Sequence, residues 1–313
     1  MNILRRFTTG LLVSLLAGAA LPALAAERIP VVASFSILGD IVARVGGDRI
    51  AVTALVGPDQ DAHVFQPAPA DIKAVARARL VVINGLGFEG WTERLTQSAG
   101  YRGSIVTASA GIKPRARVEE HDEHEEAGHD HDHHHHGSND PHAWQDPRNV
   151  VVYVNNIAAA LVALDPSGAD AYRRNAQAYI AQIEELDRWA IQQFAQIPQA
   201  KRRVITSHDA FEYFGAHYKV RFLAAQGVST DSEPSAREVA GLIRQIRSEK
   251  IRALFFENMS NPRLLEQIAR EAGVTPGGKL YADALSGSTG PAPDYLSLMR
   301  YNIKQLLEKI RLN

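Results

Sequence analysis

Short apolar runs alternate with longer amphipathic segments from residue 29 to the end of the chain. Runs rich in β-branched and other apolar residues lie at 31–34, 50–56, 80–83, 105–106, 204–206, 221–223, 253–256 and 279–281. Strands that alternate with helices are typical of a parallel sheet, and the run 80–83, which has no polar alternation, is typical of a strand buried on both faces. The pattern therefore predicts an α/β fold.

Segments with apolar residues at helical spacing separate these runs. The shorter helices are predicted at 37–45, from about 69, from about 211, at 235–248, 262–271 and 294–310. The longest begins at Ser167 and continues to about Ile197, which corresponds to a helix of roughly 45 Å. Such a helix can link two lobes. We therefore expect an N-terminal α/β lobe over residues 27–165, a linking helix over 166–198, and a C-terminal α/β lobe over 199–313.

Residues 1–26 have the features of a secretory signal peptide. Arg5 and Arg6 precede an apolar run at 11–16, and Ala23-Leu24-Ala25 resembles a cleavage site. An ordinary Sec signal accounts for the arginine pair better than a twin-arginine signal, because only the pair matches. The sequence thus predicts a periplasmic mature protein, and without a cysteine at the cleavage site we expect no lipid anchor.

Composition narrows the classes of partner and ligand. Lys and Arg number 34 against 35 Asp and Glu, so there is no global basic field to attract nucleic acid. Cysteine is absent, which removes thiolate ligands and a cysteine nucleophile. Any bound metal must therefore be held by nitrogen and oxygen atoms.

Residues 119–136 differ in kind from the rest of the chain. Eight of the twelve histidines stand there among acidic residues, namely His121, His124, His129, His131, His133, His134, His135 and His136. With hardly an apolar side chain to bury, this segment cannot fold alone. We interpret it as a surface loop.

Three histidines and one aspartate outside this segment are candidate ligands. His63 lies on the loop beyond the run 50–56, while His208 and Asp283 directly follow the runs at 204–207 and 279–282. Ligands of parallel α/β sheets collect outside the carboxyl ends of strands. His142 lies in a stretch stiffened by prolines at 141 and 147. Helix capping and other structural roles remain open for all four on spacing alone.

Two further residues have alternative interpretations. Glu257 also follows a strand, and it is expected either to orient a ligand histidine or to cap the helix that begins at Asn261-Pro262. His217 falls within a helical period and is expected to be structural.

Four separated blocks resemble one family. They are Asp61-Ala62-His63-Val64-Phe65, Asp140-Pro141-His142-Ala143-Trp144, Thr206-Ser207-His208-Asp209-Ala210-Phe211 and Tyr281-Ala282-Asp283-Ala284-Leu285-Ser286. Together they resemble the ZnuA-like (cluster A-I) zinc and manganese solute-binding proteins of bacterial ABC importers, and most closely the AztC-type branch of zinc binders. The resemblance implies two α/β lobes with a metal in the cleft between them, held by His63, His142, His208 and Asp283.

Zinc is the metal expected for this set. Three imidazoles and one carboxylate form a four-coordinate site suited to Zn²⁺, whereas Mn²⁺ favours more oxygen ligands. The resemblance implies a membrane permease as partner, a periplasmic zinc metallochaperone is a further candidate, and a monomer is expected. The histidines of residues 119–136 are expected to form weak accessory zinc sites, with passive buffering as the alternative.

The alternative functions are a zinc-dependent hydrolase and a manganese-binding receptor or adhesin of the same fold. A catalytic zinc keeps one coordination position open for water, whereas four protein ligands leave none. The chain also has neither an H-E-x-x-H nor a G-x-S-x-G motif. We therefore expect a receptor and not an enzyme.

Overall fold

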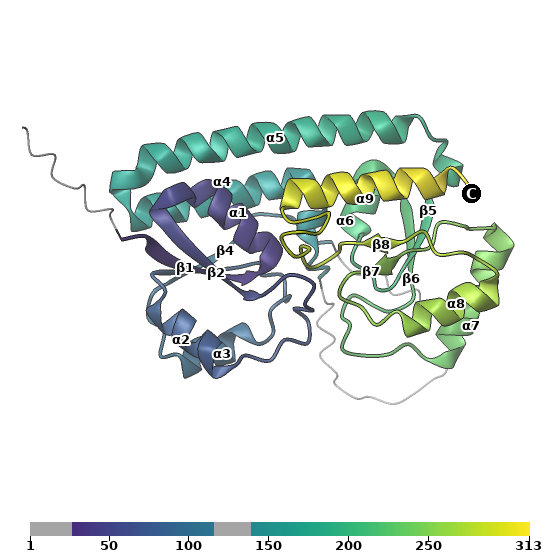
Figure 1. The fold of residues 1–313 in the computed structure, drawn as a ribbon, viewed down its shortest axis with the longest axis horizontal. Coiled ribbons are helices and arrows are strands. Elements are labelled where there is room, and N and C mark those ends of the chain that lie inside the picture. Colours follow the sequence, from purple (N-terminus) through teal and green to yellow (C-terminus); the bar gives the residue numbers. More distant parts are fainter. Residues whose placement is uncertain (1–26, 116–138) are drawn as a thin grey trace, which may run out of the picture.

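The computed structural model describes residues 27–115 and 139–313, so the predicted signal peptide and the histidine-rich segment lie outside the described residues. Two α/β lobes lie side by side, and the long helix α5 (Ala169–Ala195) runs along both of them (Figure 1). The predicted α/β fold with two lobes and a linking helix is confirmed.

The N-terminal lobe contains a four-stranded parallel sheet in the order β2-β1-β3-β4. Its strands are β1 (Ile29–Phe35), β2 (Ile50–Val56), β3 (Leu80–Ile83) and β4 (Ser104–Thr107). Helix α1 (Ser36–Gly46) covers one face, and α2 (Pro69–Arg77) and α3 (Thr92–Ser98) lie on the other (Figure 1). The parallel order brings the carboxyl ends of β1, β2 and β3 to the edge that faces the second lobe.

Helix α4 (Pro147–Leu164) was not predicted from the sequence. Asp146 caps its first turn by accepting a hydrogen bond from the Arg148 backbone N–H, and Pro147 occupies the first helical position. The helix is apolar enough to cross a membrane by length and composition. Here it packs against α1 and α5, with a fully buried stripe of Val150, Tyr153, Val154, Ile157 and Leu161. It is therefore a core helix of the lobe.

The C-terminal lobe is built from shorter strands. Parallel pairs join β5 (Arg203–Thr206) to β6 (Arg221–Ala224) and β7 (Phe256–Glu257) to β8 (Lys279–Leu280). Its helices are α6 (Glu212–Tyr218), α7 (Ala236–Glu249), α8 (Arg263–Ala272) and α9 (Tyr295–Ile310). The strand predicted at 253–256 is wrong in its bounds, because Leu254 forms only an isolated bridge to Ile205 and regular pairing starts at Phe256.

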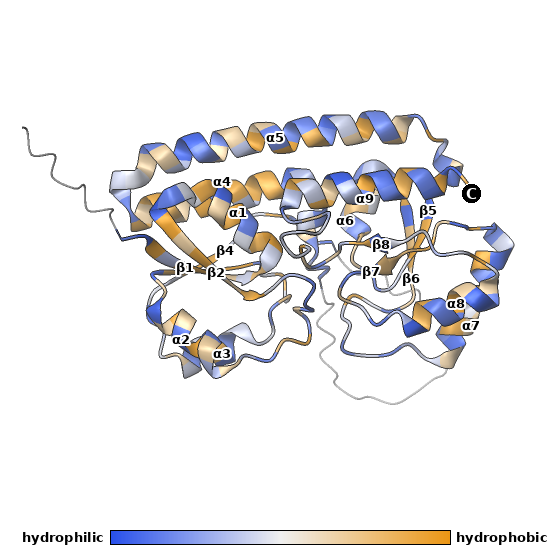
Figure 2. Ribbon diagram, viewed as in Figure 1, coloured by the Kyte–Doolittle hydropathy of each residue, from blue (hydrophilic) through white to orange (hydrophobic). Residues whose placement is uncertain are grey.

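The main hydrophobic core is continuous across the two lobes. It includes the N-terminal sheet, α4, the inner face of α5, the aromatic residues of α6 and the buried side of α9. Figure 2 shows α4 and the strands as the most apolar elements, whereas α5 alternates apolar and polar positions. A second, smaller cluster lies beneath α7 and α8. The lobes are thus joined by packing, and this fixes where the loops at the strand ends meet.

The role of α4 is tested by a matched pair of substitutions. Ile157 is fully buried on α4, whereas Ile191 is 46% exposed on α5. We expect Ile157→Ala to lower the free energy of unfolding by about 3 kcal/mol, since it removes buried methyl groups and leaves a cavity. Ile191→Ala should change it by less than about 0.5 kcal/mol. Denaturant unfolding measures both values, and equal losses would contradict the assignment of α4 to the core.

Candidate metal centre

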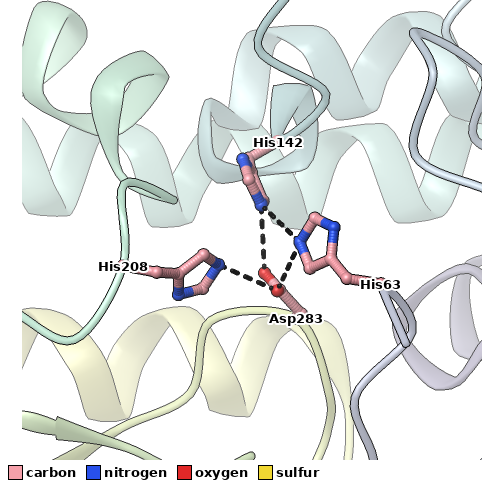
Figure 3. A group of neighbouring side chains, drawn as sticks. All are labelled: His63, His142, His208 and Asp283. Carbon is pink, nitrogen blue, oxygen red and sulfur yellow. Dashed lines mark hydrogen bonds and ion pairs between the residues drawn. The ribbon is translucent and has the colours of Figure 1, made fainter. Parts of the chain in front are cut away.

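Four side chains converge where the two lobes meet (Figure 3). His63 stands on the turn after β2, and His142 lies directly before the 3₁₀ turn Ala143–Gln145 that leads into α4. His208 follows β5 and Asp283 follows β8. The placement of His63, His208 and Asp283 at carboxyl ends of strands agrees with the prediction. Each lobe supplies two of the four side chains.

The spacing of the donor atoms is that of a coordination shell. Nε2 of His63 lies 3.3 Å from Nε2 of His142 and 3.3 Å from Oδ2 of Asp283. Nε2 of His208 lies 3.1 Å from Oδ2 of Asp283, and Nε2 of His142 lies 3.6 Å from Oδ1. Ligands bound tetrahedrally at zinc distances of about 2.0–2.1 Å are separated by about 3.3 Å. One small cation therefore fits between these four groups.

The burial of these atoms supports the same conclusion. The side chains of His142, His208 and Asp283 are fully buried, and that of His63 is 5% exposed. Nε2 of His208 and both carboxylate oxygens of Asp283 make no hydrogen bond. A buried carboxylate that makes no hydrogen bond is costly, and a divalent cation between it and the three imidazoles is the partner that this arrangement fits. No other group of three or more potential metal donors gathers in residues 27–115 and 139–313.

Carboxylates behind the imidazoles fix their orientation. Oδ1 of Asp140 accepts hydrogen bonds from the His142 backbone N–H at 2.9 Å and from its ring Nδ1 at 2.8 Å. Oε2 of Glu257 accepts from Nδ1 of His208, while Oε1 accepts from the backbone N–H groups of Ser207 and His208. With the proton on Nδ1, each Nε2 presents its lone pair to the centre.

Glu257 therefore has the first of its two predicted roles, since the backbone N–H of Arg263 at the start of α8 donates to Oδ1 of Asn261 and not to Glu257. The role of Asp140 was not predicted from the sequence. One sequence signal could have indicated this role: Asp61-Ala62-His63 and Asp140-Pro141-His142 share an Asp-x-His spacing. In both places the aspartate accepts a hydrogen bond from the histidine backbone N–H, at 2.9 Å in the case of Asp61 and His63.

The residues that follow His142 also position Asp283. Nε1 of Trp144 and Nε2 of Gln145 donate to the carbonyl oxygen of Ala282 at 3.0 and 2.8 Å. These contacts join the two lobes directly behind the carboxylate, and they were not predicted from the sequence.

His217, by contrast, pairs with Asp187 of α5 at 2.6 Å and does not join the cluster, as expected.

The charged groups of the site shift one another's pKa values. Burial alone would lower the pKa of His142, but Asp283 and Asp140 offset it and raise the pKa to about 9. Glu257 and Asp283 likewise raise the pKa of His208 well above its usual range. His208 and His142 hold the pKa of Asp283 well below its usual value despite its burial. Without metal, both histidines are thus protonated at neutral pH, and these protons compete with a cation.

Comparison with known proteins decides the family. A family model described as the periplasmic component A of the zinc-uptake complex, ZnuA, matches residues 31–309. The chain belongs to the ZnuA family. It is 33% identical over 301 residues to the iron-binding protein YfeA of Yersinia pestis, an alignment that covers 95% of this chain and 92% of that protein. It is 31% identical over 277 residues to the manganese-binding lipoprotein MntA of Halalkalibacterium halodurans, covering 88% and 87%.

Solved structures agree with this assignment. The manganese-bound periplasmic metal-binding protein of Candidatus Liberibacter asiaticus superposes with a TM-score of 0.77 at 30% identity, over 91% of this chain and all of the other. The periplasmic zinc-binding protein TroA of Treponema pallidum gives a TM-score of 0.80 at 25% identity, over 91% and 99%. The chain is therefore a periplasmic metal-binding receptor of an ABC transporter, and the prediction that it is not an enzyme is confirmed.

Two finer expectations are not settled by these relatives. Some are named lipoproteins, in contrast to the expected absence of a lipid anchor, which rests on the lack of cysteine in this sequence and stays a prediction. The relatives also do not distinguish the AztC-type branch within the family.

We expect metal binding to release about two protons per ion at pH 7, one each from His142 and His208. Both pKa values are raised, that of His142 to about 9, so at neutral pH both protons are bound and must leave before Nε2 can bind a metal. The apparent affinity should then fall about a hundredfold per unit of pH between pH 8 and pH 6. Calorimetry in buffers of different ionisation enthalpy counts the protons, and a pH-independent affinity would contradict the assignment.

We expect Glu257→Gln to weaken metal binding by about 10- to 100-fold, because an amide cannot hold His208 as firmly as the carboxylate does. Glu249→Gln is the matched control, since Glu249 pairs with Arg203 and Arg221 at the surface of the same lobe. Competition titration against a chelator measures both affinities. Equal effects of the two substitutions would show that Glu257 does not act through His208.

Proposed function

We propose that this protein is a zinc receptor that captures Zn²⁺ with His63, His142, His208 and Asp283 and delivers it to the membrane permease of an ABC importer. The observation that carries the proposal is the convergence of three imidazole nitrogens and one carboxylate, all within 4.8 Å of one another. This donor set and its spacing suit four-coordinate Zn²⁺.

A manganese or iron receptor is the second candidate. The relatives MntA and YfeA are named for manganese and iron, whereas TroA is named for zinc. Mn²⁺ and Fe²⁺ bind more weakly than Zn²⁺ to a given nitrogen and oxygen site, and Mn²⁺ favours more oxygen ligands. The only carboxylate that lies among the four donors is Asp283, since Asp140 and Glu257 contact the far sides of the imidazoles. The described residues therefore favour zinc.

The division of ligands between lobes suggests how the metal is released. His63 and His142 belong to the proposed N-terminal unit, residues 27–165, and His208 and Asp283 to the proposed C-terminal unit, residues 199–313. A small separation of the two units would increase the distance between the two pairs of ligands and so weaken the hold on the metal. Because the main core is continuous across the lobes, we propose a local rearrangement at the loops and not a wide hinge motion.

The proposal is tested by equilibrium zinc titration of the mature protein against a competing chelator. We expect one tight site per chain, loss of at least a hundredfold in affinity in His208→Ala and in Asp283→Ala, and a lower affinity for Mn²⁺ than for Zn²⁺. Deleting residues 119–136 should leave the tight site intact and remove only weaker binding.

Three results would contradict the proposal. Tight binding that survives both substitutions would place the zinc elsewhere. Tight binding that disappears with residues 119–136 would move the site to the histidine-rich segment. A tighter complex with Mn²⁺ or Fe²⁺ would favour the second candidate.

A further inference from the structure

The ligand nearest to solvent is His63. It is the one ligand whose side chain keeps some exposure, at 5% against zero for the other three. The next residue on the same turn, Val64, is half exposed. A metal ion leaving the centre therefore has its shortest path beside His63, and the turn over residues 57–65 has to move for that path to open.

The carboxylate of Asp61 joins this turn to the opposite lobe. Oδ1 of Asp61 accepts from the backbone N–H of His63 at 2.9 Å. Its Oδ2 accepts from the hydroxyl of Thr230, in the loop after β6, at 2.6 Å. The bond is short, partly buried and made to an ionised acceptor, and such bonds are roughly twice as strong as neutral ones.

The loop that carries Thr230 is itself fastened to the loop of a second ligand. The backbone N–H of Gln226 donates to the carbonyl of Ser207 at 2.9 Å, and that of Asp209 donates to the carbonyl of Gly227 at 3.2 Å. The Asp61–Thr230 hydrogen bond thus connects the turn of His63 with the loop of His208. It does so without contacting any of the four donor atoms.

A second contact holds the same turn. Nδ2 of Asn258, directly after β7, donates to Oδ1 of Asp59 at 2.9 Å and to the carbonyl of Ala284 at 3.2 Å. The Asp59 backbone N–H donates to the carbonyl of Leu285 at 2.9 Å. The turn is therefore tied to the loops of both C-terminal ligands, and the side chain of Asp61 reaches His63 and the opposite lobe at once.

We propose that Asp61 and Thr230 are positioning residues that retain the metal by holding the turn of His63 against the C-terminal lobe. The inference rests on the proposed function. The metal cannot leave beside His63 until this turn moves, and the turn cannot move until the Asp61–Thr230 hydrogen bond breaks. Removing the bond leaves the four donors in place and lowers the barrier to release.

The test is the rate of zinc dissociation from the full-length mature protein, measured by stopped flow with a chromogenic chelator in excess. We expect Thr230→Val to raise this rate by about tenfold, since it removes one hydrogen bond to a charged group without changing the shape of the side chain. Thr230→Ser keeps the hydroxyl and should restore the wild-type rate. Thr96→Val is the matched control, because the Thr96 hydroxyl bonds only within α3.

A double-mutant cycle separates this role from general loosening of the fold. Asp61→Ala should raise the dissociation rate, and adding Thr230→Val to it should have no further effect, because the two residues share one bond. Thermal unfolding of the metal-free variants checks that each one is folded.

A wild-type rate in Thr230→Val, or a fully additive effect in the double variant, would overturn the inference while leaving the proposed function standing. A wild-type protein that binds no zinc tightly would instead overturn the proposed function.

Discussion

The structure depends on a carboxylate, Asp283, that is buried among three imidazoles with no hydrogen bond to either oxygen. Removing such a charge from water is costly, and the cost is offset only by positive charge placed close to it. Two lobes have to meet at this point, because each contributes two of the four groups. The contacts of Trp144 and Gln145 with the Ala282 carbonyl keep the carboxylate in place across the junction.

The charges at this site also govern how the receptor binds and releases the metal. In the metal-free protein the positive charge comes from protons on His142 and His208, whose pKa values are raised by the neighbouring carboxylates. A divalent cation would replace those protons, and Asp140 and Glu257 hold the rings of His142 and His208 turned toward the centre. The site is therefore preorganised for binding, and release has to come from moving the loops that carry the ligands.

Much of the fold was predictable because its signals are local. Parallel strands appear as apolar runs, the linking helix as one long period, and the candidate ligands as polar residues that follow strands. Helix α4 was not predicted, because its first residues belong to the proline-containing stretch around His142 and its nearly continuous apolar residues show little amphipathic period. The strand at 253–256 was misjudged, since burial alone produces an apolar run there with little regular pairing. The hydrogen bond from Thr230 to Asp61 joins residues 169 positions apart, and no local pattern encodes it.

The central claim is that three nitrogens and one oxygen complete the shell of a single zinc ion. X-ray absorption at the zinc edge, on protein loaded with one equivalent of Zn²⁺, tests it most directly. The account predicts four light-atom neighbours at about 2.0–2.1 Å, with the outer-shell signature of three imidazoles. The His63→Ala variant should lose one imidazole from that signature. A shell of five or six ligands dominated by oxygen, or a wild-type spectrum in the variant, would contradict the account.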